Sequence, residues 1–446
     1  MNKALIGACS LIAGISHLSL GQVNNPDNSK RPNIVLIMAD DIGTECFGSY
    51  GGISYETPVL DKLALEGVRF ANCYSQPLCT PSRVMIMTGK YNFRNYEAFG
   101  YLNPNQETFG NIMKEAGYET CIAGKWQLNG TSNKKQLKDN WDDVHRPRQF
   151  GFDEYCLWQL HLDRSDGERY ADPLIFQNGE KLEGLENSYG PDVFCDFIND
   201  YISRKAGKPF FIYYPMVLVH DPFVPTPDSP AWKNKSRRYE NDTAYFRDHV
   251  KYMDKIIGRI VNKLKETGVW ENTIFIFTSD NGTHPSITSR TKNESQMVRG
   301  AKGSSLNTGN HVPMIVVWPA KGKKSSVYNG MIGFTDILPT LSEAAGVSLT
   351  NFKTDGHSFY KALTGSSKPI QHEIFIDYTP FWGNFKSNQW VMNVQYKLYR
   401  NGEFFNTRVD PLEKHPIQIP LKKEQKLISK YELIIRQKEE IAPVIW

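Results

Sequence analysis

The sequence has few cysteines for its length. Seven occur in 446 residues, and no two of them are separated by two residues, the spacing that zinc sites commonly use. The absence of this spacing argues against a zinc site held by cysteine pairs. If Cys79 is chemically occupied, at least one of the other cysteines beyond the N-terminus is unpaired. We expect most of them to be small buried residues: Cys46, Cys73, Cys121, Cys156 and Cys195.

The sequence also lacks a strong net charge and a long apolar run. The formal net charge is +4, from 52 basic and 48 acidic residues. Such a balance argues against a dedicated nucleic-acid binder, although the cluster KNKSRR at 233–238 could attract anionic substrates. The apolar stretch near the N-terminus is interrupted by Ser16 and His17, and it is too short and too polar for a stable membrane span. We therefore expect neither a nucleic-acid partner nor stable membrane insertion.

The N-terminus has the pattern of a secretory signal peptide. Lys3 precedes the apolar stretch ALIGACSLIAGISHLSLG, and small residues occur near Gly21. Cys9 lies too close to the start for a lipoprotein signal. We expect a signal peptide over 1–21, a linker over 22–30, and export of a soluble protein to the periplasm or the medium. Export would permit disulfides.

From residue 31 to about 345, short apolar runs alternate with helical periodicity. This alternation predicts an α/β domain with a mostly parallel central sheet flanked by helices. The expected strands include 33–39, 118–124, 209–219, 273–279 and 312–318, and the longest expected helix spans 240–266. After about residue 370, patterns of antiparallel strands precede a charged amphipathic helix over 422–440. We expect a large α/β domain over 31–365, carrying the chemistry, and a smaller C-terminal α+β subdomain over 366–446.

Two of the expected strands end in oxygen-bearing pairs, Asp40-Asp41 and Asp280-Asn281. In a parallel sheet both pairs would reach the same carboxyl edge, where ligands bind in open α/β folds. Carboxylate and amide oxygens suit a hard cation, Ca²⁺ or Mg²⁺. One such pair alone is more often a turn cap, but two pairs together favour a metal site.

The segment CTPSRVMIMTGK at 79–90 predicts a helix that begins at the cysteine. Pro81 suits the first turn, where a missing N–H has no cost, and an apolar run follows it. A helix N-terminus favours anions and lowers the pKa of a thiol. Cys79 and Arg83 lie one turn apart on this helix.

These residues resemble a known family. The stretch from Cys79 to Arg83 is similar to the C-x-P-S-R signature of type I sulfatases, in the alkaline-phosphatase superfamily, and the downstream TGKY fits its extended form. The resemblance continues over most of the chain, and the joint occurrence of its segments in this order is highly specific. The segments are RPNIVLIMADDIG (31–43), AGKWQL (123–128), VLVHDPFVP (217–225), FIFTSDNG (275–282), GAKGSSLNTGNHVPMIVVWP (300–319), FTDILPTL (334–341) and DPLEK (410–414).

The resemblance implies a covalent mechanism at Cys79. In such sulfatases a separate formylglycine-generating enzyme oxidises the signature cysteine to formylglycine (3-oxoalanine). One hydroxyl of the aldehyde hydrate attacks the sulfur of the sulfate ester, and the other lets the intermediate collapse to aldehyde and free sulfate. The family also implies a bound cation, Ca²⁺ in preference to Mg²⁺, whose ligands here are Asp40, Asp41, Asp280, Asn281 and residue 79 itself.

Further roles are implied for four residues that match family positions. Lys125 and Lys302 would neutralise the sulfate, Arg83 would hold the deprotonated hydrate or its metal ligands, and His220 would protonate the leaving group. Alone, His220 could equally be a structural histidine.

The chain departs from the family pattern at two places, at Gln127 and at Asn307-Thr308-Gly309-Asn310-His311, where the family usually has E-G-G-x-R after the second lysine. Gln127 replaces a histidine that commonly assists collapse of the intermediate, and glutamine cannot act as a base. His284 and His311 are candidate replacements, and Gln127 could orient the hydrate by hydrogen bonding. The expected substrate contacts are Lys125, Gln127, Lys302, His161 and His311. The segment 157–170, with His161, Arg164 and Arg169, either contacts the substrate or decorates the surface.

The sequence therefore predicts an exported sulfuric ester hydrolase that acts on a sulfated saccharide or another sulfate ester. A phosphoester or phosphonate hydrolase of the same superfamily is the nearest alternative, but such phosphatases carry additional His and Asp ligands for a second metal. A non-catalytic glycan-binding relative is the alternative of another class. The presence of Cys79, Arg83 and both lysines argues against it.

Overall fold

The structure is a computed structural model that describes residues 31–130, 143–160, 168–292, 294–350, 352–365 and 373–441. The expected signal peptide, the linker, His161 and Arg164 lie outside these ranges. A ten-stranded sheet forms the framework, in the order β12-β2-β11-β8-β1-β7-β3-β4-β5-β6. Its strands are β1 (Asn33–Ala39), β2 (Val68–Tyr74), β3 (Glu119–Lys125), β4 (Glu154–Trp158), β5 (Phe176–Gln177), β6 (Glu180–Lys181), β7 (Phe210–Pro215), β8 (Thr273–Ser279), β11 (His311–Val317) and β12 (Ser326–Gly333).

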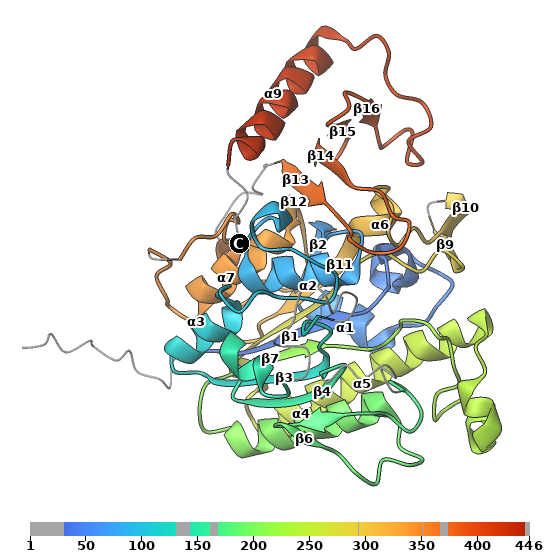
Figure 1. The fold of residues 1–446 in the computed structure, drawn as a ribbon, viewed down its shortest axis with the longest axis vertical. Helices are drawn as coiled ribbons and strands as arrows, with labels where there is room; N and C mark the ends of the chain where they lie inside the picture. Colours follow the sequence, from blue (N-terminus) through green and yellow to red (C-terminus); the bar gives the residue numbers. More distant parts are fainter. Residues whose placement is uncertain are drawn as a thin grey trace, which may run out of the picture.

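Helices cover both faces of this sheet (Figure 1). Alternate side chains of β1 point to opposite faces: Val35 and Ile37 belong to one core, and Leu36 and Met38 to the other. The first core is completed by α1 (Pro58–Glu66), α4 (Gly190–Lys205) and α5 (Phe246–Glu266), and the second by α2 (Cys79–Thr88), α3 (Phe109–Glu115) and α7 (Ile337–Ala344). Burial on both faces explains why β1, β7 and β8 are mostly apolar and do not alternate between apolar and polar residues.

The centre of the sheet is parallel. β1 pairs in parallel with β7 and β8, and β3 pairs in parallel with β4 and β7. β11 is antiparallel to both of its neighbours, and β5 and β6 extend the far edge as antiparallel strands. The mostly parallel, helix-flanked sheet expected from the sequence is therefore confirmed.

Two expected boundaries were wrong. The long helix begins at Phe246, not at residue 240, because the Asp242 side chain accepts a hydrogen bond from the backbone N–H of Ala244 and starts a separate 3-10 turn. The strand expected over 209–219 ends at Pro215, and a proline has no N–H with which to extend the ladder.

The C-terminal part forms a small sheet of its own at the top of Figure 1. Antiparallel strands β13 (Ile374–Tyr378), β14 (Asn388–Met392), β15 (Tyr396–Tyr399) and β16 (Phe404–Asn406) are packed against α9 (Lys422–Glu439). The expected antiparallel sheet and helix are confirmed, whereas the exact boundary at residue 366 stays a prediction. The remaining elements are short: β9 (Thr288–Thr291), β10 (Glu294–Arg299), α6 (Asn307–Asn310) and α8 (Tyr360–Leu363).

Two further features concern the described residues as a whole. All six cysteines within them are buried and unpaired, as expected for small core residues. None of the helices in the described ranges is long and apolar enough to cross a membrane.

Candidate active site

The register of β1 against β8 brings the two oxygen-bearing pairs together. Ala39 lies opposite Ser279 at the ends of these parallel strands. The backbone N–H of Asp41 donates to Asp280 Oδ1 (3.1 Å), and Asn281 Nδ2 donates to Asp41 Oδ1 (2.8 Å). The meeting of the two pairs at one carboxyl edge is thus as the sequence predicted. All four side chains of these pairs are fully buried.

The unpaired oxygens of this cluster fit a cation. Asp40 Oδ1 and Asn281 Oδ1 are buried and have no hydrogen-bond partner within the described ranges. A buried oxygen without a partner is costly, and a hard cation would satisfy both atoms. Ligand atoms of Asp40, Asp41 and His220 also lie within 4.8 Å of one another. The oxygen donors present are therefore of the type that Ca²⁺ or Mg²⁺ accepts, although the group with the spacing of a metal site contains His220 and not Asp280.

Three basic side chains reach the same carboxylates. Lys125 Nζ is 2.7 Å from Asp40 Oδ2, Arg83 Nη2 is 2.9 Å from Asp280 Oδ2, and Lys302 Nζ is 2.5 Å from Asp41 Oδ2. Burial by itself raises the pKa of Asp40, but the surrounding positive charge, led by Lys125, outweighs it and holds this pKa below its usual value. The carboxylates are thus held in place by fixed positive charges.

Cys79 begins α2, as the sequence predicted, and its side chain faces the cluster. Its Sγ is 3.5 Å from Gln127 Oε1, and only 3% of the residue is exposed. The prediction of a lowered thiol pKa was wrong. Burial raises the pKa of Cys79, and the opposing charges of Lys125 and Lys302 do not compensate. An unmodified Cys79 is therefore a protonated thiol and a poor nucleophile.

His220 joins the cluster from the segment that follows β7. Its Nε2 is 3.0 Å from Lys302 Nζ, and its Nδ1 is 2.6 Å from the carbonyl oxygen of Asp221. Burial and then the charge of Lys302 lower the pKa of His220. In this state the imidazole is neutral, with its Nε2 accepting from Lys302 and its Nδ1 donating to the carbonyl.

A cavity of about 460 Å³ opens above these residues. Cys79, Lys125, Gln127, His220 and Lys302 all line it. The structure thus brings together five residues that the sequence placed in the chemistry, from segments spread over more than 220 positions. His284 and Arg169, named as candidates, also line it. Gln159 also lines it and lies in the segment 157–170 that was named as a candidate substrate contact, although it was not singled out there. Sequence reasoning missed Phe99, Trp382 and Phe385; the aromatic stretch PFWGNF at 380–385 is a signal that could have indicated the last two.

Comparison with known proteins identifies the family. The sulfatase family model matches residues 32–347, which include the carboxylate cluster, Cys79, Lys125, His220 and Lys302, but not Trp382 and Phe385 of the cavity wall. The chain belongs to the sulfatase family.

Individual sulfatases are similar to the chain over different lengths. An arylsulfatase of Hemicentrotus pulcherrimus is 30% identical over 377 residues, covering 78% of this chain and 64% of that protein, so the chain spans less than two thirds of that relative. An N-acetylglucosamine-6-O-sulfatase of Bacteroides thetaiotaomicron is 33% identical over 224 residues, 49% of this chain and 36% of the relative. A solved structure in complex with D-glucosamine-2-N,6-O-disulfate has the same fold, with a TM-score of 0.73 at 22% identity, covering 93% of this chain and 99% of that one.

His311 was expected in this sulfatase as a substrate contact or a replacement base, but the structure places it at the start of β11 and not in the lining of the cavity. It is the first residue of β11 and lies opposite Tyr74 of β2, so its ring stacks on Tyr74 at 5.1 Å between centroids. Its Nε2 is 2.9 Å from the carbonyl oxygen of Ala71. Both contacts are with residues of β2, and His311 is not part of the cavity lining. The expected roles of His311 as a substrate contact and as the replacement base therefore stay predictions without support from these contacts.

The small C-terminal sheet holds the backbone that follows Lys302. Tyr378 Oη donates to the carbonyl of Gly303 (3.1 Å), Tyr399 Oη is 2.8 Å from Ser305 Oγ, and Lys397 Nζ donates to the carbonyl of Ser305. Lys397 also forms a buried ion pair with Glu413 at 2.9 Å. The site therefore depends on residues from both parts of the sulfatase.

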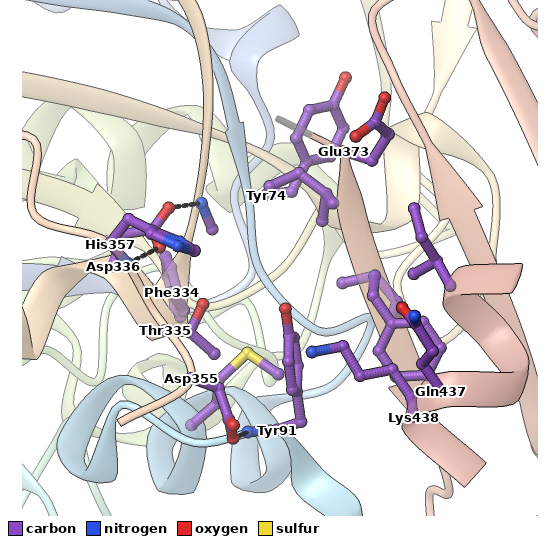
Figure 2. A pocket seen from close by; sticks show the side chains of 16 residues that line it. Tyr74, Tyr91, Phe334, Thr335, Asp336, Asp355, His357, Glu373, Gln437 and Lys438 are labelled. Carbon is purple, nitrogen blue, oxygen red and sulfur yellow. Dashed lines mark hydrogen bonds between the residues drawn. The ribbon is translucent and has the colours of Figure 1, made fainter. Parts of the chain in front are cut away.

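A second cavity, of about 220 Å³, lies between the larger sheet and the C-terminal sheet (Figure 2). Its carboxylates are engaged in local structure. Asp336 accepts hydrogen bonds from the backbone N–H groups of Gly333 and His357, and Asp355 accepts one from that of Tyr91. These groups fix turns, and the cavity is separate from the cluster around Cys79.

Proposed function

We propose that the protein hydrolyses sulfate esters at the cavity above Cys79. One observation carries the proposal. The side chain that begins α2 lies in a cavity shared with two lysines, beside a carboxylate cluster with two unpaired buried oxygens. A dianionic transition state would be stabilised there by fixed positive charge.

We infer that the cation of this sulfatase is Ca²⁺, held by Asp40, Asp41, Asp280 and Asn281 together with residue 79. The support is the set of oxygen donors, of which Asp40 Oδ1 and Asn281 Oδ1 have no protein partner. When bound, the cation would supply Lewis-acid polarisation of a sulfate oxygen.

Conversion of Cys79 to formylglycine by a maturation enzyme is the second part of the proposal. The buried thiol has a raised pKa, so it is badly suited to attack sulfur itself. As an aldehyde hydrate, residue 79 would offer one hydroxyl to the sulfur and a second whose loss of a proton releases sulfate. Gln127 Oε1, at 3.5 Å from Sγ, is placed to accept a hydrogen bond from such a hydroxyl.

The basic residues have separate tasks. Lys125 and Lys302 present their ammonium groups at the floor of the cavity, where they would neutralise sulfate oxygens; loss of one such fixed charge lowers the rate by about 10²- to 10³-fold. Arg83, 1% exposed, pairs with Asp280 and Asp40 and so keeps the carboxylates in register. His220 Nε2 accepts from the Lys302 ammonium 3.0 Å away in this structure, so it would have to take up a proton once substrate is bound before it could donate one to the leaving oxygen.

A sulfated saccharide is the substrate class that we propose. The N-acetylglucosamine-6-O-sulfatase relative supports it. Export to the periplasm or the medium, where sulfated polysaccharides occur, is part of the same proposal and rests on the N-terminal sequence pattern.

Hydrolysis of phosphoesters by a two-metal site is less well supported than hydrolysis of sulfate esters. Within the described ranges, a single group of His, Cys, Asp or Glu side chains has the spacing of a metal site, the group of Asp40, Asp41 and His220. A non-catalytic glycan-binding role would not require the ion pairs that hold Arg83, Lys125 and Lys302 against buried carboxylates.

Turnover of 4-nitrophenyl sulfate by protein produced with a formylglycine-generating enzyme tests the proposal. We expect activity in the native protein and none in Cys79→Ala. Cys73→Ala is the matched control, because Cys73 is also buried but lies on β2 and does not line the cavity. Hydrolysis of 4-nitrophenyl phosphate in preference to the sulfate would contradict the proposal.

A further inference from the structure

The cavity extends beyond the groups that would hold the scissile sulfate, and aromatic side chains form part of its wall. Phe381, Trp382 and Phe385 are 55%, 47% and 41% exposed, and all three lie in the loop between β13 and β14. Trp382 and Phe385 line the cavity together with Phe99. Large apolar side chains gathered at a cavity mouth mark a ligand-binding surface.

Contacts with the larger domain fix this loop over the cavity. The ring of Trp382 stacks on Phe99 at 4.4 Å between centroids, with the planes 22° apart. Tyr96 Oη donates to the carbonyl of Pro380 at 2.8 Å. Phe385 lies directly against Gly303, because a Cβ at that glycine would be 2.1 Å from the ring. The aromatic wall is therefore a built part of the site.

The same cavity contains two polar atoms that have no hydrogen-bond partner among the described residues. Gln159 is 6% exposed, and its Oε1 forms no hydrogen bond. The Arg169 guanidinium rests on the ring of Trp158 at 4.2 Å, and its buried Nη1 has no hydrogen-bond partner in the part of the chain that the structure describes. No carboxylate of the described residues forms an ion pair with Arg169. A buried cationic donor and an amide left unpaired are costly unless a ligand satisfies them.

We propose that Trp382, Phe385, Arg169 and Gln159 form a saccharide subsite that selects a second anionic group. The apolar C–H face of a pyranose ring would lie against Trp382 and Phe385, and Gln159 would hydrogen-bond a hydroxyl. Lys125 and Lys302 neutralise the scissile sulfate, so the separate charge of Arg169 pairs with another anion on the saccharide, a carboxylate or a second sulfate. The inference rests on the proposed function and narrows its substrate to a saccharide with two anionic groups.

The charge requirement is tested by substrate preference. The kcat/KM of a sulfated saccharide with a second anion is divided by that of its counterpart that carries the scissile sulfate alone. Arg169→Gln should lower this ratio by about 10- to 100-fold, as expected for loss of a charged hydrogen bond, and Arg169→Lys should restore part of it. A fall in this ratio only when the second anion is a sulfate identifies a second sulfate as the partner of Arg169. A fall only when the second anion is a uronate carboxylate identifies a carboxylate. An unchanged ratio for both pairs would overturn the inference.

The aromatic wall is tested by a matched pair of variants. Trp382→Ala should lower kcat/KM for the saccharide by about 10-fold, in line with loss of a stacked aromatic contact. Phe381→Ala is the control, because Phe381 lies in the same loop, is more exposed and does not line the cavity. Equal effects of the two changes would refute the assignment of Trp382.

Binding measurements separate this inference from the proposed function. In the Cys79→Ala background, calorimetry with the same saccharide pairs reports affinity without turnover. A preference for the dianionic saccharide that Arg169→Gln removes would support the subsite even if no sulfate ester were hydrolysed. Hydrolysis of 4-nitrophenyl sulfate with no such preference in binding or catalysis would leave the sulfatase function standing and overturn the subsite.

Discussion

Replacing Lys397 by Met would show how strongly the small C-terminal sheet supports the active site. The Lys397 side chain is fully buried and donates to the carbonyl of Ser305 and to Glu413, which is itself 5% exposed. Breaking a buried ion pair costs about 3–5 kcal/mol because one charge is left unpaired. The Tyr399 hydroxyl still donates to Glu413, so we expect the lower part of that range. Lys397→Met with Glu413→Gln should recover most of the lost stability.

The stability difference should also depend on pH. Burial lowers the pKa of Lys397 to about 8, against the opposing charge of Glu413, from a usual value of 10.5. Between these two values the unfolded chain binds a proton that the folded protein does not, so the native protein gains stability as the pH rises through this window. At one pH unit for about 1.4 kcal/mol, the destabilisation caused by Lys397→Met should grow by about 2–3 kcal/mol from pH 7 to pH 10.

Urea unfolding at both pH values measures the free energy of unfolding, and turnover of an aryl sulfate measures the site. Because Ser305 lies three residues after Lys302, kcat should fall by about 10-fold under conditions where the variant stays folded. Arg400→Met is the control, since Arg400 is a basic residue at the end of the same strand whose side chain is 61% exposed. Full kcat in a folded Lys397→Met protein, or a stability difference that does not change with pH, would refute this reasoning.

Other consequences follow at the cluster itself. Asp280→Ala should remove bound calcium and abolish turnover, because a hard-cation site loses one of few anionic donors; metal analysis checks this, and full activity after chelation would contradict it. Gln127→Ala should slow turnover without abolishing it, since the neutral amide can accept a hydrogen bond from the hydrate but cannot act as the base that deprotonates it. His284→Ala should lower the steady-state rate further and give a burst of leaving group if His284 is the base; an unchanged rate excludes it. Arg83→Met should lower the free energy of unfolding of the metal-free protein by about 3–5 kcal/mol, and added calcium should recover part of this loss in chemical denaturation; equal stability of the two proteins would show that Arg83 does not hold the carboxylates.

The sequence predicted the structure best where the residue pattern of a segment also determines the position of that segment in the fold. β1 and β8 are largely apolar, are buried at every position and are followed by polar pairs, and they are neighbours in the sheet with those pairs in register. The helix at Cys79 begins where the proline and the apolar run indicate. Strands with mixed patterns were not predicted: β2 alternates buried and half-buried residues, and β12 contains an Asn-Gly pair.

Parts of the site that depend on long-range contacts could not be predicted. Lys397 reaches Ser305 across 92 positions, and Trp382 stacks on Phe99 although nothing in either segment indicates the other. The lowered thiol pKa expected from the helix N-terminus was overturned by burial, a quantity that the linear sequence does not contain. Likewise, the position of His311 in motif order gave no sign that strand pairing would turn its ring onto Tyr74.

The mass of the peptide that carries residue 79, measured in protein that turns over a sulfate ester, tests the account most directly. Cleavage after Arg69 and Arg83 releases residues 70–83, which contain both Cys79 and Cys73, so the second cysteine is an internal control. We expect residue 79 as the aldehyde or its hydrate and Cys73 unchanged, with the modified fraction proportional to the turnover rate. Fully active protein with an unmodified cysteine at position 79 would contradict the mechanism.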